Sequence, residues 1–281
     1  MASIEGKNNY KAILGANPNP YGVFWLEIKQ VLSTGNVIIR NLTEKGKLKI
    51  PQVEETIEQD FIYPAIRGSD INRWGHEHKI FLLMVQDPKT REPYPQVLMK
   101  QKYPRTFSYL LQFKDILLSR GSKTIRRLAE NTEFYAMFGI EQKTVAPYKV
   151  VWKAMSNDIF AGVVSQFKTH FGFKTVVPLH TTSFFATNNE DEAHYLCAIV
   201  NSTPVREFIK SFSSAGRGFG TPSVMEHVGI PKFDPKSKVH QNLAEISKKC
   251  HQSKLEDKRK EVEVLEKEND ELVKQLFNTH N

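Results

Sequence analysis

Hydrophobic residues in the first fifty positions form short runs that are separated by turn-forming residues. Residues 17–20 (Asn-Pro-Asn-Pro) and 33–36 (Ser-Thr-Gly-Asn) are such turns, because Pro presets the backbone dihedrals of a turn and Gly adopts those that other residues avoid. The runs around these turns predict strands over residues 22–28, 37–41 and 47–50. We therefore expect a small β-rich N-terminal segment over residues 1–52.

The middle of the chain mixes the patterns of strands and helices. Apolar residues at helical spacing predict helices over residues 106–119 and 190–200, and Pro204 suits the start of the next helix. Short apolar or alternating runs predict further strands over residues 79–85, 148–154, 174–179 and 183–187. The order of these elements is not a regular β-α-β alternation, so the pattern favours an α+β fold with a mixed sheet.

The pattern changes after Pro235, because neither Gly nor Pro occurs again before the end of the chain. Residues 243–281 are therefore expected to form a long C-terminal helical segment. One stripe of this segment follows the a/d spacing of a coiled coil and consists of Val262, Leu265, Asn269, Leu272 and Leu276. Asn269 takes an a position, where a buried amide fixes the register of packed helices. The stripe predicts packing against another helix, in this chain or in a second copy; an amphipathic helix folded back on its own domain is the alternative.

The charge of the chain adds a candidate ligand to this picture. The net charge is +8, while 40% of the 281 residues are hydrophobic, an ordinary fraction for a folded globular protein. Residues 243–277 hold eight Lys and Arg against nine Asp and Glu, so the excess positive charge belongs to the body that precedes them. A basic body suits the binding of a polyanion such as a nucleic acid.

The sequence lacks the features of a membrane or secreted protein. No apolar run approaches the ~20 residues that a membrane-spanning helix needs, and the first residues lack the apolar core of a secretion signal. Cys197 and Cys250 are too few for a disulfide framework, and the apolar surroundings of Cys197 predict a buried, reduced thiol. We expect a cytoplasmic protein without a membrane partner.

The densest basic cluster of the body lies in residues 120–127, directly after a predicted helix. Its candidate phosphate contacts are Arg120, Ser122, Lys123, Arg126 and Arg127. Cations and hydroxyl groups are the side chains that hold DNA phosphates. A solvated helix end is the alternative interpretation.

Two further segments offer groups that could reach DNA bases. In residues 61–74, Arg67 or Arg73 could present two parallel donors to guanine, unless Asp70 pairs with one of them inside the protein. We favour a structural Asp70, because an unpaired acid would repel phosphates. Residues 216–222 carry Arg217 and Thr221 in a glycine-rich loop whose backbone a partner could approach closely; an ordinary surface turn is the alternative.

The motifs of catalysis are absent or incomplete. Adenine methylation needs a glycine-rich loop for S-adenosylmethionine and an Asn/Asp-Pro-Pro-aromatic motif that holds a flipped base. Neither occurs, and Asn19 separates the two prolines of the nearest match. Glu141 and Lys143 match one half of a metal-dependent nuclease motif, but the acids that precede them do not lie on a predicted strand. We therefore expect no catalytic or metal-binding residues and no cofactor in this chain.

Eight short segments, in this order, resemble the target-recognition region at the C-terminal end of adenine-specific DNA methyltransferases and of type IIG restriction-modification enzymes. They are residues 12–15 (AILG), 22–26 (GVFWL), 63–71 (YPAIRGSDI), 134–139 (FYAMFG), 146–153 (APYKVVWK), 192–196 (EAHYL), 201–203 (NST) and 220–224 (GTPSV). The resemblance implies a target-recognition domain over residues 53–242. Its fold would be that of the C-terminal domain of Taq I-like methyltransferases, which is also similar to type I specificity subunits.

The resemblance also implies partners. Double-stranded DNA would be the ligand, and residues 243–281 would be a helical spacer that packs against a partner helix. The catalytic half of those enzymes has no counterpart in this sequence, so the chain would be an excised fragment or a separate specificity polypeptide. A methyltransferase catalytic domain or subunit would then hold S-adenosylmethionine.

Three functional hypotheses follow from the sequence. The leading one is a non-catalytic module that gives a restriction-modification adenine methyltransferase its DNA sequence specificity. The second is a metal-dependent DNA nuclease that uses Glu141 and Lys143. The third is a protein-interaction scaffold that forms a homodimer through its C-terminal helix.

Overall fold

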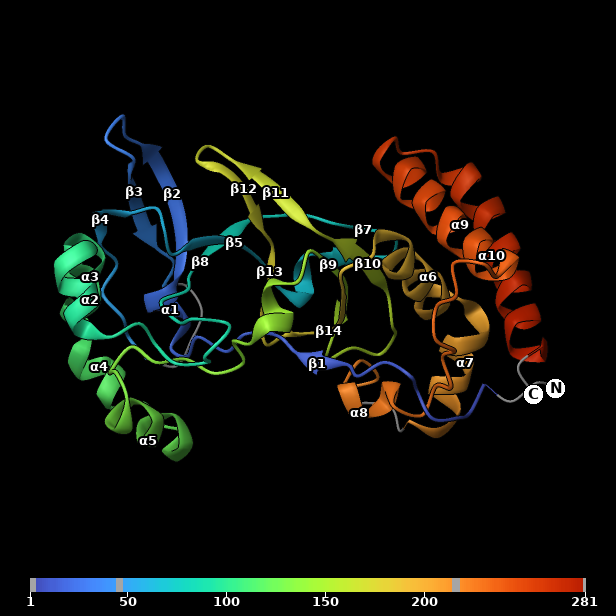
Figure 1. Ribbon diagram of the computed structural model, residues 1–281, viewed down its shortest axis with the longest axis horizontal. Coiled ribbons are helices and arrows are strands. Elements are labelled where there is room, and N and C mark those ends of the chain that lie inside the picture. Colours follow the sequence, from blue (N-terminus) through green and yellow to red (C-terminus); the bar gives the residue numbers. More distant parts are fainter. Residues whose placement is uncertain (1–3, 44–47, 214–217, 280–281) are drawn as a thin grey trace.

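The computed structural model describes residues 4–43, 48–213 and 218–279. Figure 1 shows an elongated molecule in which helices gather at both ends and sheets lie between them. One hydrophobic core lies in each end, and a small third cluster, which includes Ile66, Val151 and Phe184, lies between the two. We call the two ends the sheet lobe (left in Figure 1) and the helical lobe (right).

The sheet lobe is built on a six-stranded mixed sheet of order β13-β5-β8-β2-β3-β4. Its neighbours are antiparallel except for β13 and β5, which are parallel. The strands are β2 (Trp25–Val31), β3 (Asn36–Asn41), β4 (Glu54–Glu58), β5 (Ile62–Ile66), β8 (Ile80–Leu83) and β13 (Val177–Pro178). The helices of this lobe are α1 (Tyr21–Phe24), α2 (Gln96–Lys102), α3 (Pro104–Gln112), α4 (Lys114–Leu118) and α5 (Lys123–Asn131). Every second residue of β3 is buried, as expected for a strand with one face on a core.

A four-stranded antiparallel sheet of order β1-β14-β9-β10 leads into the helical lobe. These strands are β1 (Ile13–Leu14), β9 (Tyr148–Lys153), β10 (Ala161–Val164) and β14 (Thr182–Thr187). The helices are α6 (Glu190–Asn201), α7 (Thr203–Phe212), α8 (Pro222–Met225), α9 (Lys238–Leu255) and α10 (Arg259–Thr279). Every residue of α6 from Ala193 onward is buried, so this helix forms the centre of the lobe.

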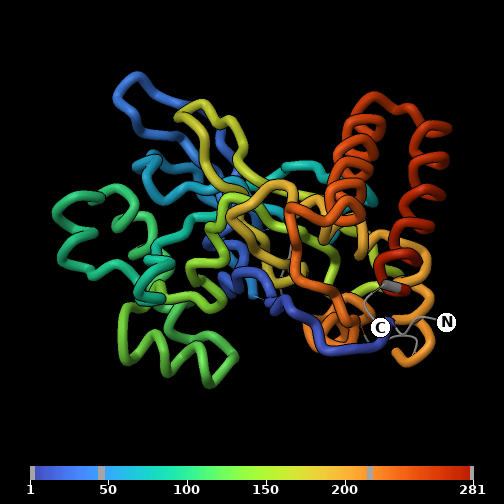
Figure 2. Tube along the Cα trace, turned by 45° about the vertical axis from the view of Figure 1, so that its right-hand side comes forward, coloured from blue at the N-terminus to red at the C-terminus, as the bar shows by residue number. Residues whose placement is uncertain are grey.

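Short elements complete the fold. Two 3-10 helices, η1 (Gly68–Asp70) and η2 (Gln142–Val145), lie in connections between the sheets. Two hairpins form separate two-stranded ladders: β6 (Ile71–Asn72) with β7 (Gly75–His76), and β11 (Gln166–Thr169) with β12 (Gly172–Thr175). Figure 2 shows the β11–β12 hairpin (yellow) rising beside the β2–β3 hairpin (blue).

The predicted α+β class, with mixed sheets and a long C-terminal helix, is confirmed. Strands occur within the predicted ranges 37–41, 79–85, 148–154 and 183–187, and α6 and α7 match the helices expected at residues 190–200 and after. The division at residues 52 and 242 stays a prediction. In the fold, β2 and β3 share a sheet with β5 and β8, and α9 begins at Lys238.

Four local predictions are corrected. Residues 48–50 are not a strand, because Pro51 lacks the N–H that a ladder needs, and β4 forms at Glu54–Glu58 instead; Lys47 lies outside the described residues. The first three residues of the strand expected at 22–28 belong to helix α1. The helix expected over 106–119 ends at Gln112 and restarts at Lys114, because Phe113 turns into the core and is 1% exposed. The strand expected over 174–179 is interrupted between β12 and β13.

The C-terminal helices form a hairpin that packs on the same chain. Asp257, with φ of +52°, reverses the chain between α9 and α10. Of the a/d stripe, Leu265, Asn269 and Leu276 are buried, while Val262 and Leu272 are partly buried against the core of the helical lobe. The stripe therefore packs within its own chain. A homodimer through the stripe stays a prediction and would have to displace these contacts.

Asn269 joins α10 to the central helix. Its Nδ2 donates to the carbonyl oxygen of Ala198 in α6 at 2.9 Å, and its side chain is fully buried. Of the helices in the described part of the chain, none has the length and apolar character needed to cross a lipid bilayer.

Replacing this amide should destabilise the helical lobe. We expect Asn269→Ala to lower the free energy of unfolding by about 2–3 kcal/mol, because it leaves a cavity and an unpaired carbonyl. Val264→Ala, at a position that is 64% exposed, should change it by less than about 0.5 kcal/mol. Urea unfolding measures both. A midpoint that rises with protein concentration would instead indicate that the stripe packs between two copies.

Candidate nucleic-acid interface

Helix α5 carries the cations of the basic cluster on its outer face. Ser122 caps the helix, and its Oγ accepts a hydrogen bond from the backbone N–H of Ile125 at 3.5 Å. Ile125 is buried, whereas Lys123 and Arg127 are exposed and Arg126 is half-buried. The three cations share one face because they are spaced three and four residues apart.

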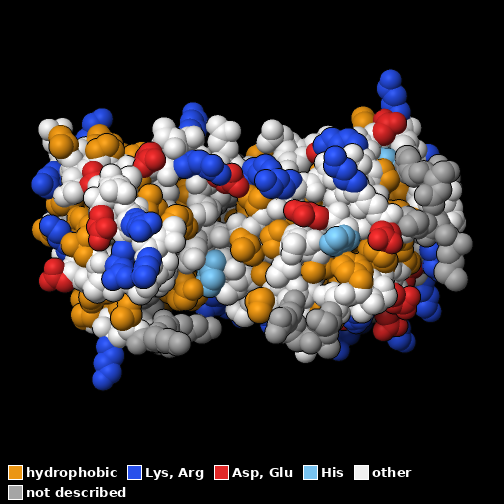
Figure 3. Space-filling model, turned by 90° about the horizontal axis from the view of Figure 1, so that it is seen from below, with side chains coloured by type: hydrophobic (Ala, Val, Ile, Leu, Met, Phe, Trp, Pro, Cys, Tyr) orange, Lys and Arg blue, Asp and Glu red, His pale blue; other side chains and the backbone are white. Residues whose placement is uncertain are grey.

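These cations have no acidic partner among the described residues, since no described carboxylate oxygen lies within 4.0 Å of their nitrogens. By contrast, both cations of residues 61–74, Arg67 and Arg73, are paired with acids, as described below. Figure 3 shows Lys and Arg side chains on the underside of the sheet lobe, at the left of that view, with some Asp and Glu among them. Unpaired, solvated cations on a helix face are suited to phosphate contacts.

Arg120 is a correction to the predicted cluster. Its side chain is 1% exposed and donates to the carbonyl oxygens of Ala136 at 2.5 Å and of Phe134 at 2.8 Å. Burial lowers the pKa of the guanidinium to about 10. Arg120 therefore holds the segment after α5 against the lobe and does not reach phosphates.

Arg67 is occupied by Asp70, as the structural alternative predicted. The guanidinium Nε and Nη2 donate to the two carboxylate oxygens at 2.9 Å each, and the side chains are 16% and 1% exposed. The same carboxylate accepts the backbone N–H of Arg67 and so closes the η1 turn. The Nε and Nη2 donors of Arg67 are thus used within the protein, and the guanidinium is held in place by Asp70.

Arg73 is occupied as well, by the C-terminal hairpin. Its Nε lies 3.0 Å from the Oε1 of Glu266 in α10, and its Nη2 donates to the carbonyl oxygen of Asn201 at 2.6 Å. Burial lowers the pKa of Arg73, and the charge of Glu266 opposes this shift. The next residue, Trp74, takes a left-handed φ of +61° and donates its indole N–H to the same carboxylate at 2.6 Å.

His251 of α9 forms a second link between the hairpin and the sheets. Its Nε2 accepts the backbone N–H of Val163 in β10 at 3.1 Å, which leaves the proton on Nδ1 for the carbonyl oxygen of Ser247 at 2.7 Å. Burial lowers its pKa to about 4, so the ring is neutral at physiological pH. Arg73, Trp74 and His251 thus form a structural junction that ties the C-terminal hairpin to the β6–β7 hairpin, α6 and β10. The sequence could not reveal it, because the partners are far apart along the chain.

The glycine-rich loop is only partly within the described residues, and Arg217 lies outside them. The carbonyl oxygen of Gly220 accepts the indole N–H of Trp152 at 2.8 Å, and a Cβ at Gly220 would lie 1.9 Å from the carbonyl oxygen of Lys153. The backbone that approaches Gly220 closely is therefore that of strand β9 in the same chain, and not that of a partner. Thr221 is half-buried at the start of α8, with its Oγ1 3.2 Å from the hydroxyl of Ser223.

Glu141 and Lys143 lie on the 3-10 turn η2 rather than on adjacent strands. The Glu141 carboxylate accepts a hydrogen bond from Arg91 at 2.7 Å. Over residues 4–43, 48–213 and 218–279, no group of three or more His, Cys, Asp or Glu is placed to hold a metal ion. Cys197 and Cys250 are buried free thiols.

Two features of chemical interest were not predicted from the sequence. One is the β11–β12 hairpin, whose Gly172, with φ of +103°, is the signal that could have located the turn. The other is Lys149 of β9, which is fully buried and donates its Nζ to the carbonyl oxygen of Ala146 at 2.5 Å and to Thr175 Oγ1 at 3.0 Å. Burial lowers the pKa of Lys149 to about 7, but the side chain is enclosed and faces no solvent.

The fold is similar to part of a restriction-modification enzyme of known structure. The likeness to the type IIL restriction-modification enzyme MmeI, solved in complex with DNA, covers 99% of this chain and 35% of the MmeI chain, with a TM-score of 0.62 and 11% sequence identity. A likeness to the type IIG restriction endonuclease BpuSI covers 92% of this chain and 32% of that one at 12% identity, but its TM-score of 0.36 is too low to carry an argument. No protein-family model and no curated protein matches the chain. The comparison shows a shared fold over about a third of the length of MmeI.

Removing Arg120 should affect stability rather than surface charge alone. We expect Arg120→Ala to lower the free energy of unfolding by about 3 kcal/mol, because two buried carbonyl groups lose their donor. Arg127→Ala removes the same charge from an exposed position and should change it by about 0.5 kcal/mol or less. Chemical denaturation of the two variants measures this difference, and equal stabilities would return Arg120 to the candidate phosphate contacts.

Lys149 should make stability depend on pH. Its pKa is about 7 in the folded chain, whereas an ordinary lysine has a pKa of 10.5, so the unfolded chain binds more protons between these pH values. Stability therefore rises with pH over this window, and the full penalty for the buried charge is present below pH 7. Lys149→Met removes this pH dependence together with the penalty for the buried charge. The excess of the variant's free energy of unfolding over that of the wild type should therefore shrink by about 1.4 kcal/mol per pH unit above pH 7. Urea titrations at pH 7 and 9 test this, and parallel curves for the two proteins would contradict it.

Proposed function

We propose that the chain is a sequence-specific DNA-binding module that gives a restriction-modification adenine methyltransferase its specificity and has no catalytic centre of its own. The observation that carries the proposal is the fold shared over 99% of the chain with MmeI, an enzyme solved in complex with DNA. Because a shared fold does not by itself imply a shared function, support for DNA binding has to come from the surface of this chain.

The charge of the α5 face supports the proposal. Lys123, Arg126 and Arg127 project from one helix face without an acidic partner among the described residues. A cation that is already paired inside the protein gains little from a phosphate, because it must first lose its partner. The unpaired cations of α5 can neutralise phosphates at no such cost and release bound counterions.

The proposed partners follow from the part of the enzyme that the chain covers. Since the chain spans about a third of the length of MmeI, the methyl transfer and the S-adenosylmethionine site would belong to a methyltransferase domain or subunit. The role of this chain would be to bind the duplex and position it. Incubation of the chain alone with duplex DNA and Mg²⁺ should leave the DNA intact, and cleavage would contradict the proposal.

Charge reversal on α5 should weaken binding to all duplexes alike. A preferred site is first selected from random duplexes with the wild-type chain. Arg126→Glu with Arg127→Glu should then lower affinity for the selected and for a scrambled duplex by the same factor, about tenfold or more at low salt. The slope of log affinity against log salt should become shallower by about 2, because each phosphate that is no longer neutralised changes it by about 1.

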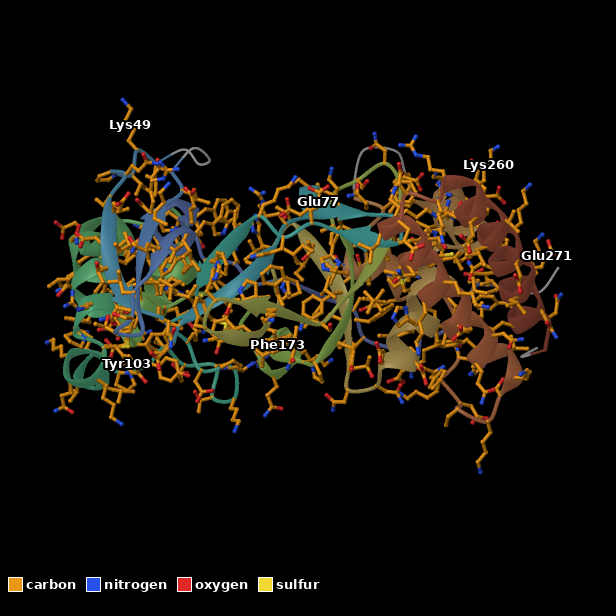
Figure 4. The ribbon with its side chains drawn as sticks, turned by 90° about the horizontal axis from the view of Figure 1, so that it is seen from above. Lys49, Glu77, Tyr103, Phe173, Lys260 and Glu271 are labelled. Atoms are coloured by element: carbon orange, nitrogen blue, oxygen red, sulfur yellow. The ribbon has the colours of Figure 1, made fainter. Side chains whose placement is uncertain are left out.

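The matched control is Lys260→Glu with Lys267→Glu, an equal change of charge on two exposed residues of α10. Figure 4 shows Lys260 at the opposite end of the molecule from Tyr103, which precedes helix α3 in the sheet lobe. The control should keep wild-type affinity and salt slope. Equal losses in both variants would mean that net charge, rather than the α5 face, drives binding.

A further inference from the structure

The β11–β12 hairpin has one face anchored along its length and one face that is anchored only at its base, where Thr175 is hydrogen-bonded to Lys149 and Ala146; we call the second the free face. Its register pairs Phe167 with Lys174 and Lys168 with Phe173. Residues directly opposite each other project to the same side of a ladder, and successive residues project to opposite sides. Phe167 and Lys174 therefore lie on one face, and Lys168 and Phe173 on the other.

The anchored face packs on the sheet lobe. The Phe167 ring lies 4.5 Å from the ring of His78. Lys174 Nζ donates to the carbonyl oxygen of Asp60 at 2.8 Å and lies 4.6 Å from the centre of the Tyr63 ring. These contacts fix the direction in which the hairpin stands, and Figure 1 shows it extending from the sheets toward the upper edge of the molecule.

The free face carries a set of side chains without partners in the described chain. Phe173 is 67% exposed, and Lys168 and Gln166, which lies two residues before Lys168, are exposed as well. A large aromatic ring held in water on an anchored, narrow hairpin is costly for the chain alone. Figure 4 shows Phe173 midway along the molecule, between Tyr103 of one lobe and Lys260 of the other.

The charge around the hairpin identifies the kind of partner. No Asp or Glu occurs between Asp158 and Glu190, and Lys168, His170 and Lys174 fall within that stretch. Asp60 lies beside Lys174 on the anchored face, whereas the free face combines the cation of Lys168, the amide of Gln166 and the exposed ring of Phe173. This combination is complementary to nucleic acid, which offers phosphates, base edges and stacked bases.

We propose that the β11–β12 hairpin enters a groove of duplex DNA and contacts bases through Gln166 and Phe173, while Lys168 holds a phosphate. This inference rests on the proposed DNA-binding function and names the element that would discriminate between sequences. A two-stranded ribbon fits the major groove, where a Gln amide can pair with adenine and an aromatic ring can contact the methyl group of thymine. Figure 1 places the hairpin and α5 at opposite edges of the molecule, so their contributions can be separated.

The native tryptophans make a direct test available. All three, Trp25, Trp74 and Trp152, are buried, with exposed fractions of 4%, 1% and 0%. In Phe173→Trp the introduced indole would therefore be the one that a soluble quencher such as acrylamide reaches. Val264→Trp, at a position on α10 that is 64% exposed, is the matched control.

Binding of the selected duplex, followed independently by the anisotropy of a labelled DNA, should lower acrylamide quenching of Phe173→Trp several-fold and leave Val264→Trp unchanged. Gln166→Ala should weaken binding to the selected duplex about tenfold and leave binding to a scrambled duplex unchanged. Gln142→Ala, which removes an amide from η2, should change neither.

The outcomes separate the inference from the proposed function. If the duplex binds selectively while the introduced indole stays fully accessible, the hairpin inference is overturned and the DNA-binding function stands. If Gln166→Ala weakens both duplexes equally, the hairpin does not read bases and the inference fails. A wild-type chain that selects no duplex would overturn the inference together with the function on which it rests.

Discussion

The junction at Glu266 is the polar contact that ties the C-terminal hairpin to the β6–β7 hairpin. One carboxylate of α10 receives both the guanidinium of Arg73 and the indole N–H of Trp74. Trp74 holds a left-handed backbone conformation to make this contact, which costs free energy for a bulky residue. Because loss of Glu266 would leave the buried indole N–H of Trp74 without its acceptor, the junction stabilises the packing of the C-terminal hairpin.

The two arginines near the glycine turn are both paired within the protein. Arg67 and Arg73 are each held by an acid, and that pairing fixes the η1 turn and the β6–β7 hairpin. Cations that are occupied within the architecture leave the surface to other elements. In this fold those elements are the α5 face and the free face of β11–β12. Under the proposed function the α5 face would bind DNA of any sequence, and the hairpin would discriminate between bases.

The sequence predicted the parts of the fold that periodicity controls. The a/d spacing located the buried stripe of α10, including Asn269, and apolar runs located β8, β9 and β14. Asp70 was predicted to be structural because an unpaired acid repels phosphates, and its pairing with Arg67 confirms this.

What the sequence could not reveal depends on tertiary contacts. The burial of Arg120 depends on two carbonyl groups of the segment after α5, and no local pattern distinguishes it from Arg127. The pairing of Arg73 with Glu266 joins residues that are far apart along the chain. The break at Phe113 accompanies the burial of its ring beside Tyr109 in the core, a tertiary contact that helical spacing alone does not predict.

The path of the chain between the two larger sheets has a consequence for how the protein can be divided or altered. In sequence order the backbone passes from β1 to β2, from β8 to β9, from β10 to β13, and from β13 back to β14, and so alternates between the sheets. A continuous block cut from the chain therefore leaves one sheet short of an edge strand: the six-stranded sheet without β13, or the four-stranded sheet without β1. Changes of sequence and length in projecting turns leave this interwoven frame intact.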